Sequence, residues 1–192
     1  MRSNLPVTGH EILLEEGKTI VSTTDLQGNI TYANPYFINI SGFTEDELIG
    51  APQNIVRHPD MPAEAFADLW CVIRQGSPWT GMVKNRCKNG DYYWVLANIT
   101  PVIENGKPVG YMSVRTRPSR EMVEQAAQAY AAFRKGEAQG LKISHGKVVK
   151  DGPLQRLHAR TRLSLSARLL LVGVLPAVVL VACAASLFGN SS

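Results

Sequence analysis

A long apolar stretch lies near the C-terminus of the 192-residue chain. Residues 169–188 (LLLVGVLPAVVLVACAASLF) carry no charge, and only Gly173, Pro176 and Ser186 interrupt the apolar side chains. Twenty residues in a helix span roughly 30 Å, the thickness of the hydrocarbon layer of a bilayer. A buried core helix is the alternative, but a small domain seldom buries a helix that is apolar on every side. The stretch therefore predicts a transmembrane helix.

Charge is divided unequally along the chain. Residues 1–133 hold 11 Lys/Arg and 14 Asp/Glu, whereas residues 134–192 hold 9 and 2. A basic tail indicates a nucleic acid or an anionic membrane as its partner. No recognition-helix motif accompanies the basic residues, so we expect no nucleic-acid partner. By the positive-inside rule, the arginines before the apolar stretch predict the inner (cytoplasmic) membrane, with the preceding domain in the cytoplasm: Arg156, Arg160, Arg162 and Arg168.

Short strand signals come before a helical region. Residues 19–25 and 30–33 are rich in β-branched side chains and are separated by a turn, which predicts a hairpin. Asn34-Pro35 is a helix start, and Thr44 with Glu47 forms a capping box. A longer helix is predicted after Pro62, since an apolar stripe repeats there at helical spacing: Phe66, Leu69, Trp70 and Ile73.

Three strands follow that helix, at residues 80–88, 91–103 and 109–116. Asn89-Gly90 between the first two is a strong hairpin signal. Antiparallel hairpins at both ends with helices between them predict an α+β fold, with one curved antiparallel sheet and helices on one face. The cleft between sheet and helices is the expected ligand pocket. With the apolar stretch added, the expected fold class includes a C-terminal transmembrane helix.

Several motifs in this region resemble those of PAS domains. They are Thr23-Thr24-Asp25, Ile30–Asn34, Ser41-Gly42-Phe43, Glu47–Gly50, Lys88–Trp94 and Thr100-Pro101-Val102. The run Val56–Pro62 (VRHPDMP), with Phe66, Trp79 and Val83–Arg86, is similar to the flavin-binding aerotaxis receptors (Aer) within that family. The resemblance implies the PAS fold and four parts: an N-terminal cap (1–18), a PAS sensor domain (19–118), a linker with a basic juxtamembrane segment (119–168) and the transmembrane helix (169–188).

The same resemblance implies FAD as the cofactor and three residues that its binding requires, Arg57, His58 and Asp60. A guanidinium suits charge-assisted bonds to a diphosphate, although Arg57 would also suit a surface salt bridge. His58 would hydrogen-bond the ligand or orient Arg57; the alternative is a haem ligand, because some PAS domains bind haem. Asp60 would equally suit the N-cap of the helix after Pro62.

Four further residues are candidates for the cofactor site. By resemblance Asn34 contacts the ligand, or else it only caps a helix, and Trp79 contacts the flavin ring, or else it is a core aromatic. The amide of Asn85 offers a donor and an acceptor to the edge of the ring, unless the backbone already satisfies it. We expect Tyr93 to face the pocket opposite Asn85 if the turn contains a glycine bulge, whereas a two-residue turn would place Trp94 there.

No catalytic or metal-binding pattern accompanies these residues. The three cysteines, Cys71, Cys87 and Cys183, have neither metal nor redox spacing. Blue-light PAS domains carry a reactive cysteine where this chain has Gln53, so redox sensing is favoured over light sensing. We therefore expect a protein that is not an enzyme.

The expected function is a membrane-anchored PAS sensor that binds FAD and signals a redox or oxygen-linked state in aerotaxis and chemotaxis. The alternative is a protein-interaction PAS module whose pocket is empty or holds another ligand such as haem. A homodimer is expected. Since the chain shows no heptad region for output, chemotaxis signalling proteins or a separate output protein are the expected partners. Residues 121–135 form a predicted helix within the linker, through which a signal would leave the domain.

Overall fold

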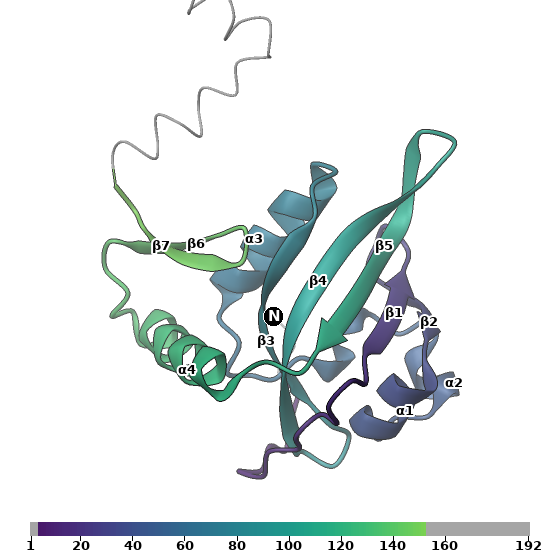
Figure 1. Cartoon of the computed structure of the whole chain (residues 1–192), viewed down its shortest axis with the longest axis horizontal. Helices are drawn as coiled ribbons and strands as arrows, with labels where there is room; N and C mark the ends of the chain where they lie inside the picture. The colour runs from purple at the N-terminus through teal and green to yellow at the C-terminus, as the bar shows by residue number, and fades with distance from the viewer. Residues whose placement is uncertain (1–3, 153–192) are drawn as a thin grey trace, which may run out of the picture. The chain divides into compact units, whose positions relative to one another are not determined.

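Five strands form one antiparallel sheet in the order β2-β1-β5-β4-β3 in the computed structural model, which describes residues 4–152 (Figure 1). The sheet and its helices comprise β1 (Ile20–Thr24), β2 (Ile30–Ala33), α1 (Pro35–Ser41), α2 (Glu45–Leu48), the 3-10 helix η1 (Gln53–Val56), α3 (Ala63–Arg74), β3 (Trp79–Arg86), β4 (Tyr92–Glu104) and β5 (Lys107–Thr116). They are followed by α4 (Arg120–Lys135), β6 (Leu141–Ser144) and β7 (Lys147–Lys150). The expected antiparallel sheet and its helices are confirmed.

Local capping determines where the short helices begin. The Asn34 side chain accepts a hydrogen bond from the Phe37 amide, and Pro35 occupies the first turn of α1. Thr44 and Glu47 form a complete capping box at the start of α2. The two helices therefore begin at the residues that the sequence indicates.

The turn between β3 and β4 sets which side chains face each side of the sheet. Asn85 pairs with Tyr93, and the Gly90 amide donates to the carbonyl of Cys87 across a three-residue turn. Gly90 has a φ of 103°, a conformation that glycine adopts without the steric cost of a side chain. This is the register expected for a turn with a glycine bulge. Side chains of even-numbered residues in β3 and β4 therefore project away from those of Asn85 and Tyr93.

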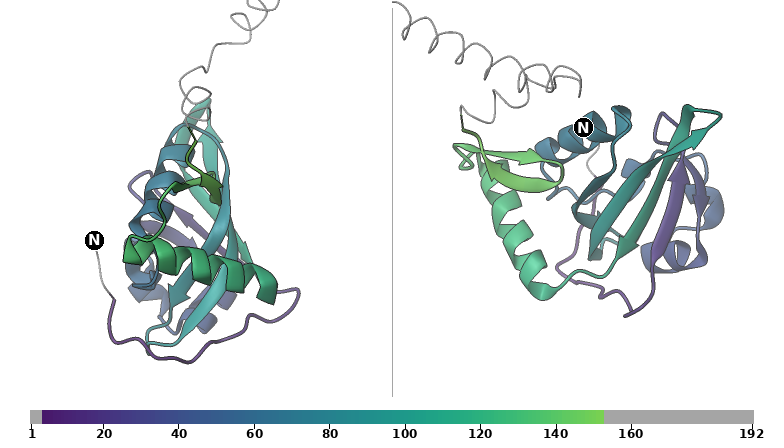
Figure 2. Two further views of the ribbon diagram at one scale, coloured as in Figure 1. Left: turned by 90° about the vertical axis from the view of Figure 1, so that its left-hand side faces the viewer. Right: turned by 45° about the horizontal axis from the view of Figure 1, so that its top comes forward.

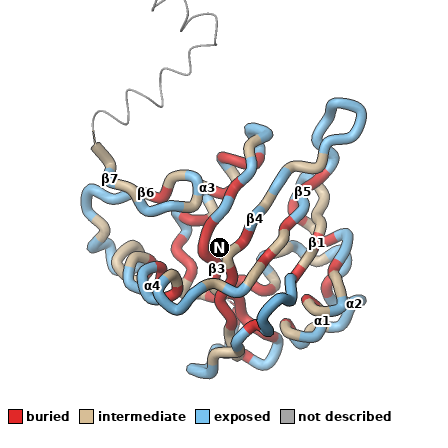
Figure 3. The backbone as a smooth tube through the Cα atoms, in the orientation of Figure 1, coloured by how far each residue is buried: buried red, intermediate tan, exposed pale blue. Residues whose placement is uncertain are grey.

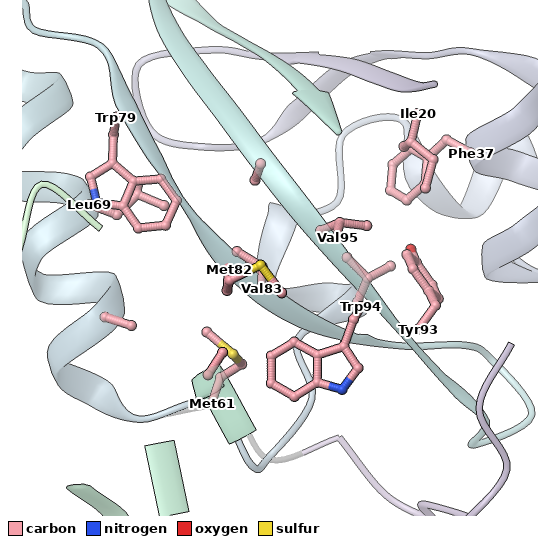
Figure 4. Close-up of a cluster of buried hydrophobic side chains, with 14 of the residues drawn as sticks. Ile20, Phe37, Met61, Leu69, Trp79, Met82, Val83, Tyr93, Trp94 and Val95 are labelled. Atoms are coloured by element: carbon pink, nitrogen blue, oxygen red, sulfur yellow. The ribbon is translucent and has the colours of Figure 1, made fainter. Parts of the chain in front are cut away.

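The buried core lies between the sheet and α1, α2 and α3 (Figure 3). Its largest fully buried side chains include Trp79, Tyr93, Phe37 and Ile20 (Figure 4). These apolar side chains leave water when the sheet closes over the helices, which is the main favourable term in folding.

The helix α4 packs on the opposite face of the sheet (Figure 2). The Tyr130 ring stacks on Trp94 at 6.2 Å between ring centroids, and its hydroxyl donates to the Met82 carbonyl over 2.8 Å. The β6–β7 hairpin that follows was not predicted, and its strands of only four residues each give a short signal. On this face α4 thus covers the sheet at β3 and β4, whereas Tyr32 of β2 and Met112 of β5 remain exposed.

The expected fold class needs one correction, the transmembrane helix. The longest described helix, α4, has 16 residues and spans only about 24 Å, and charged residues occur along it. No helix within residues 4–152 is long and apolar enough to cross a bilayer. The stretch 169–188, on which that expectation rested, lies outside the described residues.

Candidate functional site

A cavity of about 160 Å³ lies between the sheet, η1 and α3. One wall is apolar and comes from α3, with Phe66, Leu69, Trp70 and Ile73. Polar side chains approach from the other walls: Arg57, Asn85, Ser113 and Arg115, with Gln27, Gln53 and Asn54. An apolar pocket with a few convergent polar groups is the usual form of a small-molecule site.

Arg57 enters this cavity from the segment after η1. Its backbone bridges to Asn85 on the free edge of β3, so its side chain points to the same face of the sheet as that of Asn85. The side chain is 5% exposed, donates to the Met61 carbonyl over 2.7 Å and lies 4.6 Å above the Phe66 ring centre. The Nε atom is buried and has no partner, and burial lowers the pKa of the guanidinium.

Arg115 enters from β5 on the same face of the sheet. It is 4% exposed, and it donates to the hydroxyls of Ser113 over 3.0 Å and Ser22 over 2.7 Å. One guanidinium nitrogen, Nη1, is buried without a partner, and burial lowers the pKa of the group. The resemblance did not assign Arg115 to the site. Tyr111, Ser113 and Arg115 alternate along β5 and so share one face of the sheet, and this pattern would have predicted that Arg115 lines the cavity.

The two guanidinium groups have no acidic counterpart in the cavity. No aspartate or glutamate lines it, and neither arginine forms an ion pair among the described residues. Buried charges in proteins are normally paired, because isolating one from water is costly. The cavity therefore holds uncompensated positive charge beside an apolar surface.

Comparison with known proteins agrees with this fold. Residues 30–115 match the family model described as the PAS fold. The chain contains a PAS domain. Its sequence is 48% identical over 157 residues to the aerotaxis receptor of Escherichia coli (strain K12), covering 82% of this chain and 31% of the receptor. The PAS domain found here thus resembles that of an aerotaxis receptor, and the chain spans about a third of that receptor's length.

Other relatives share shorter parts of the chain. The nitrogen fixation regulatory protein of Klebsiella pneumoniae is 32% identical over 91 residues, which is 47% of this chain and 18% of that protein. The dark structure of the blue-light photoreceptor Aureochrome1 LOV superposes with a TM-score of 0.51 at 20% identity, covering 62% of this chain and 86% of the other. The structural likeness shows a shared fold.

Within the PAS domain, Asn85 and Tyr93 lie beside the arginines. Asn85 is 4% exposed and lines the cavity. Tyr93 is fully buried behind the lining, and its hydroxyl has no partner within hydrogen-bonding geometry. Burial raises the pKa of Tyr93, and the positive charge of nearby Arg115 opposes that rise. A neutral phenol therefore stands near the Arg115 cation.

His58 lies outside the cavity lining, near the face that α4 covers. Its ring is 3% exposed, packs edge-on against Tyr92 at 5.7 Å and accepts a hydrogen bond from the Asp60 amide. Burial, with the charge of Lys84, lowers the pKa of His58 to about 4, so the ring is neutral near pH 7. No histidine lines the cavity itself.

Asp60 also points away from the cavity. It accepts from Lys84 over 2.8 Å and pairs with Arg134 of α4. Burial raises the pKa of its carboxyl, but the hydrogen bond and charge of Lys84 outweigh this and the net pKa is lowered. The N-cap of α3 is Pro62, so Asp60 does not cap that helix.

Asn34 and Trp79 are engaged elsewhere in the PAS domain. Besides capping α1, the Asn34 amide accepts from the Val21 backbone and donates to the Thr19 carbonyl, which joins α1 to β1. The Trp79 indole donates to Asp68 over 2.7 Å and is not part of the cavity lining. Of the seven residues named from the sequence, the structure brings Arg57 and Asn85 into the cavity, with Tyr93 directly behind them.

Proposed function

We propose that this PAS domain binds FAD in the cavity between the sheet and α3 and reports the redox state of the flavin in aerotaxis signalling. The observation that carries the proposal is the pair of buried guanidinium groups, Arg57 and Arg115, without an acidic counterpart. A dinucleotide with an anionic diphosphate and an apolar ring system matches both the charge and the apolar wall.

The residues present fit such a cofactor. The unpartnered Nε of Arg57 and Nη1 of Arg115 would bind its anionic groups, and the Asn85 amide would orient the polar edge of a ring. The apolar α3 wall would exclude water from the ring. When bound, a flavin supplies a ring that gains and loses electrons and protons, while these side chains hold it in place.

Binding requires the cavity to widen. Its volume of about 160 Å³ is below the roughly 300–1,000 Å³ of typical small-molecule sites. Trp70 lines it, and a Cβ placed at Gly28 would come within 2.8 Å of the Trp70 ring, so the ring rests directly on the backbone of the β1–β2 turn. Movement of the Trp70 side chain would therefore open space for the ring system.

The comparisons support a sensor rather than an enzyme. The relatives are a receptor and a regulatory protein by name. Arg57, Asn85 and Arg115 of this chain lie within residues 30–115, which match the PAS fold. We propose no catalytic step. Dimerisation, output through chemotaxis signalling proteins or a separate output protein, and a cytoplasmic location stay predictions.

The visible spectrum of the purified full chain tests the proposal. We expect flavin absorbance that bleaches with dithionite, and loss of most bound flavin in Arg57→Gln. The matched control is Arg120→Gln, an arginine that pairs with Glu11 on the other face of the sheet. A colourless protein that takes up no added FAD would favour a protein-interaction module, and a Soret band would favour haem; either result contradicts the proposal.

A further inference from the structure

The segment 57–61 has two sides, and they face different parts of the molecule. Arg57 projects into the cavity, whereas Asp60 projects toward α4 on the opposite face of the sheet. We propose that Asp60 is a positioning residue that couples the cavity loop to α4, rather than a residue that contacts the ligand. The proposal deepens the proposed function, since the loop it describes carries Arg57.

The loop is held together as one unit by its own hydrogen bonds. The Arg57 guanidinium donates to the Met61 carbonyl over 2.7 Å, and the Asp60 amide donates to Nδ1 of His58 over 3.1 Å. The His58 amide also donates to the Lys84 carbonyl on the edge of β3. Because the two ends of the loop are bonded to each other, displacing Arg57 must disturb the position of Asp60.

Asp60 connects this unit to two other elements. One carboxylate oxygen accepts from Lys84 of β3 over 2.8 Å, and the other pairs with Arg134 in the last turn of α4. The Lys84 side chain is 12% exposed and lies 4.0 Å above the Tyr92 ring centre, so this part of the cluster is shielded from water. Shielding strengthens an ion pair relative to one in open solvent.

The other attachments of α4 do not involve this loop. Tyr130 bonds to the Met82 carbonyl and stacks on Trp94, and Arg120 pairs with Glu11 near the start of the helix. The last turn of α4 is thus joined to the loop, whereas its first turn is joined to the N-terminal segment. The N-terminal segment bonds to the loop in turn, because the Asn4 side chain donates to the Arg57 carbonyl over 2.9 Å. Of the two ion pairs on the helix, only Arg134–Asp60 therefore reaches the loop directly.

Anion binding at Arg57 would then reach α4 through a short path. A ligand anion bonded to the free Nε of Arg57 would draw the guanidinium toward the cavity and weaken its Nη2 bond to the Met61 carbonyl. The loop would then loosen, and the contact of Asp60 with Arg134 would change. The last turn of α4 would thus have two states, one with the Asp60–Arg134 contact and one without it. A ligand shifts the equilibrium between these states only as far as it binds one of them more tightly than the other.

Hydrogen exchange of the full chain without ligand tests the coupling directly. We expect Arg134→Gln to increase deuterium uptake by peptides covering residues 57–62 by up to about fivefold in rate, the upper end for loss of an exposed ion pair. The matched variant Arg120→Gln, on the same helix and also ion-paired, should affect those peptides much less, because it reaches the loop only through the N-terminal segment. Arg134→Lys, which keeps the charge, should restore most of the protection. Equal effects of Arg134→Gln and Arg120→Gln would overturn the proposal.

A second measurement separates this proposal from the proposed function. Added FAD should change exchange in α4 of the wild-type chain and not in Asp60→Asn. If no variant binds FAD, the proposed function fails while the ligand-free exchange result still decides the coupling. If Asp60→Asn loses FAD as completely as Arg57→Gln while Arg134→Gln leaves the loop unchanged, Asp60 acts at the ligand and the coupling is wrong.

Discussion

At the scale of single residues, a buried arginine such as Arg115 affects the stability of the ligand-free protein and the binding of an anion in opposite directions. Arg115 is 4% exposed and lacks an acidic partner, so it costs free energy in the ligand-free protein. The same charge is available to attract an anion. A residue of this kind lowers the free energy of unfolding of the ligand-free protein, whereas in the proposed function it would raise the affinity for an anion.

Arg115→Met should therefore separate the two properties. We expect the free energy of unfolding without ligand to be unchanged or raised by about 1 kcal/mol, because an apolar side chain of similar length replaces an unpaired buried charge. Flavin affinity should fall at the same time. Urea denaturation and flavin titration measure the two effects, with Arg120→Met as the control that leaves the affinity unchanged. A large loss of ligand-free stability would show that the bonds to Ser22 and Ser113 outweigh the cost of burying the charge.

His58 makes stability depend on pH in a defined window. Its folded-state pKa of about 4 lies below the ordinary value of 6.5, so between these values the unfolded chain binds a proton that the folded protein excludes. Stability should rise with pH across this window, by on the order of 3 kcal/mol in total. In His58→Gln this contribution should disappear, as measured by urea denaturation at pH 4.5 and 7.5. His145→Asn, at an exposed turn position, should retain it; an unchanged slope in His58→Gln would contradict the assignment.

At the scale of elements, the β6–β7 hairpin attaches to the PAS domain through its turn. The Asp68 carboxylate of α3 accepts from the amides of His145 and Gly146 as well as from the Trp79 indole. Gly146 has a φ of 76°, and a Cβ there would collide with the Thr80 carbonyl of β3. The hairpin can approach β3 this closely only because the turn lacks a side chain at this position.

Gly146→Ala should undock the hairpin. Gly140→Ala provides a matched control, since Gly140 has a nearly equal φ of 72° but no atom within 4 Å of the position that a Cβ would occupy. Both substitutions introduce backbone strain of roughly 1–2 kcal/mol, and only the first adds a collision. We expect faster proteolysis within residues 136–150 for Gly146→Ala than for Gly140→Ala. Equal cleavage rates would show that the contact with β3 does not hold the hairpin.

At the scale of the whole molecule, the described residues up to Lys150 form one compact unit, the first of the two into which the chain divides. The sheet, the cavity and the α4 contacts all lie within the first unit. A chain that ends at Lys150 should therefore unfold cooperatively, with the same urea midpoint and slope as the full chain. A lower midpoint would show that residues 151–192 contribute to the stability of the first unit. Far-UV circular dichroism during urea denaturation gives the midpoint and the slope for the truncated chain and for the full chain.

Much of the element order could be predicted from the sequence because its signals are local. The Asn34 cap, the Thr44–Glu47 capping box and the Asn89-Gly90 turn each depend on a few neighbouring residues. The attachment of the β6–β7 hairpin could not be predicted, because it depends on Asp68, which is 77 residues away from His145. Local patterns carry no information about such a partner.

The sequence by itself determined that residues 57–62 hold a concentrated set of polar and charged side chains, and its resemblance to PAS domains indicated a cofactor loop. Which of them face the cavity depends on how the loop joins the sheet. Arg57 pairs with Asn85 on the edge of β3 and so projects inward, while His58 and Asp60 project toward the α4 face. An irregular loop has no periodicity of its own, so its side-chain directions are set by the strand that it joins.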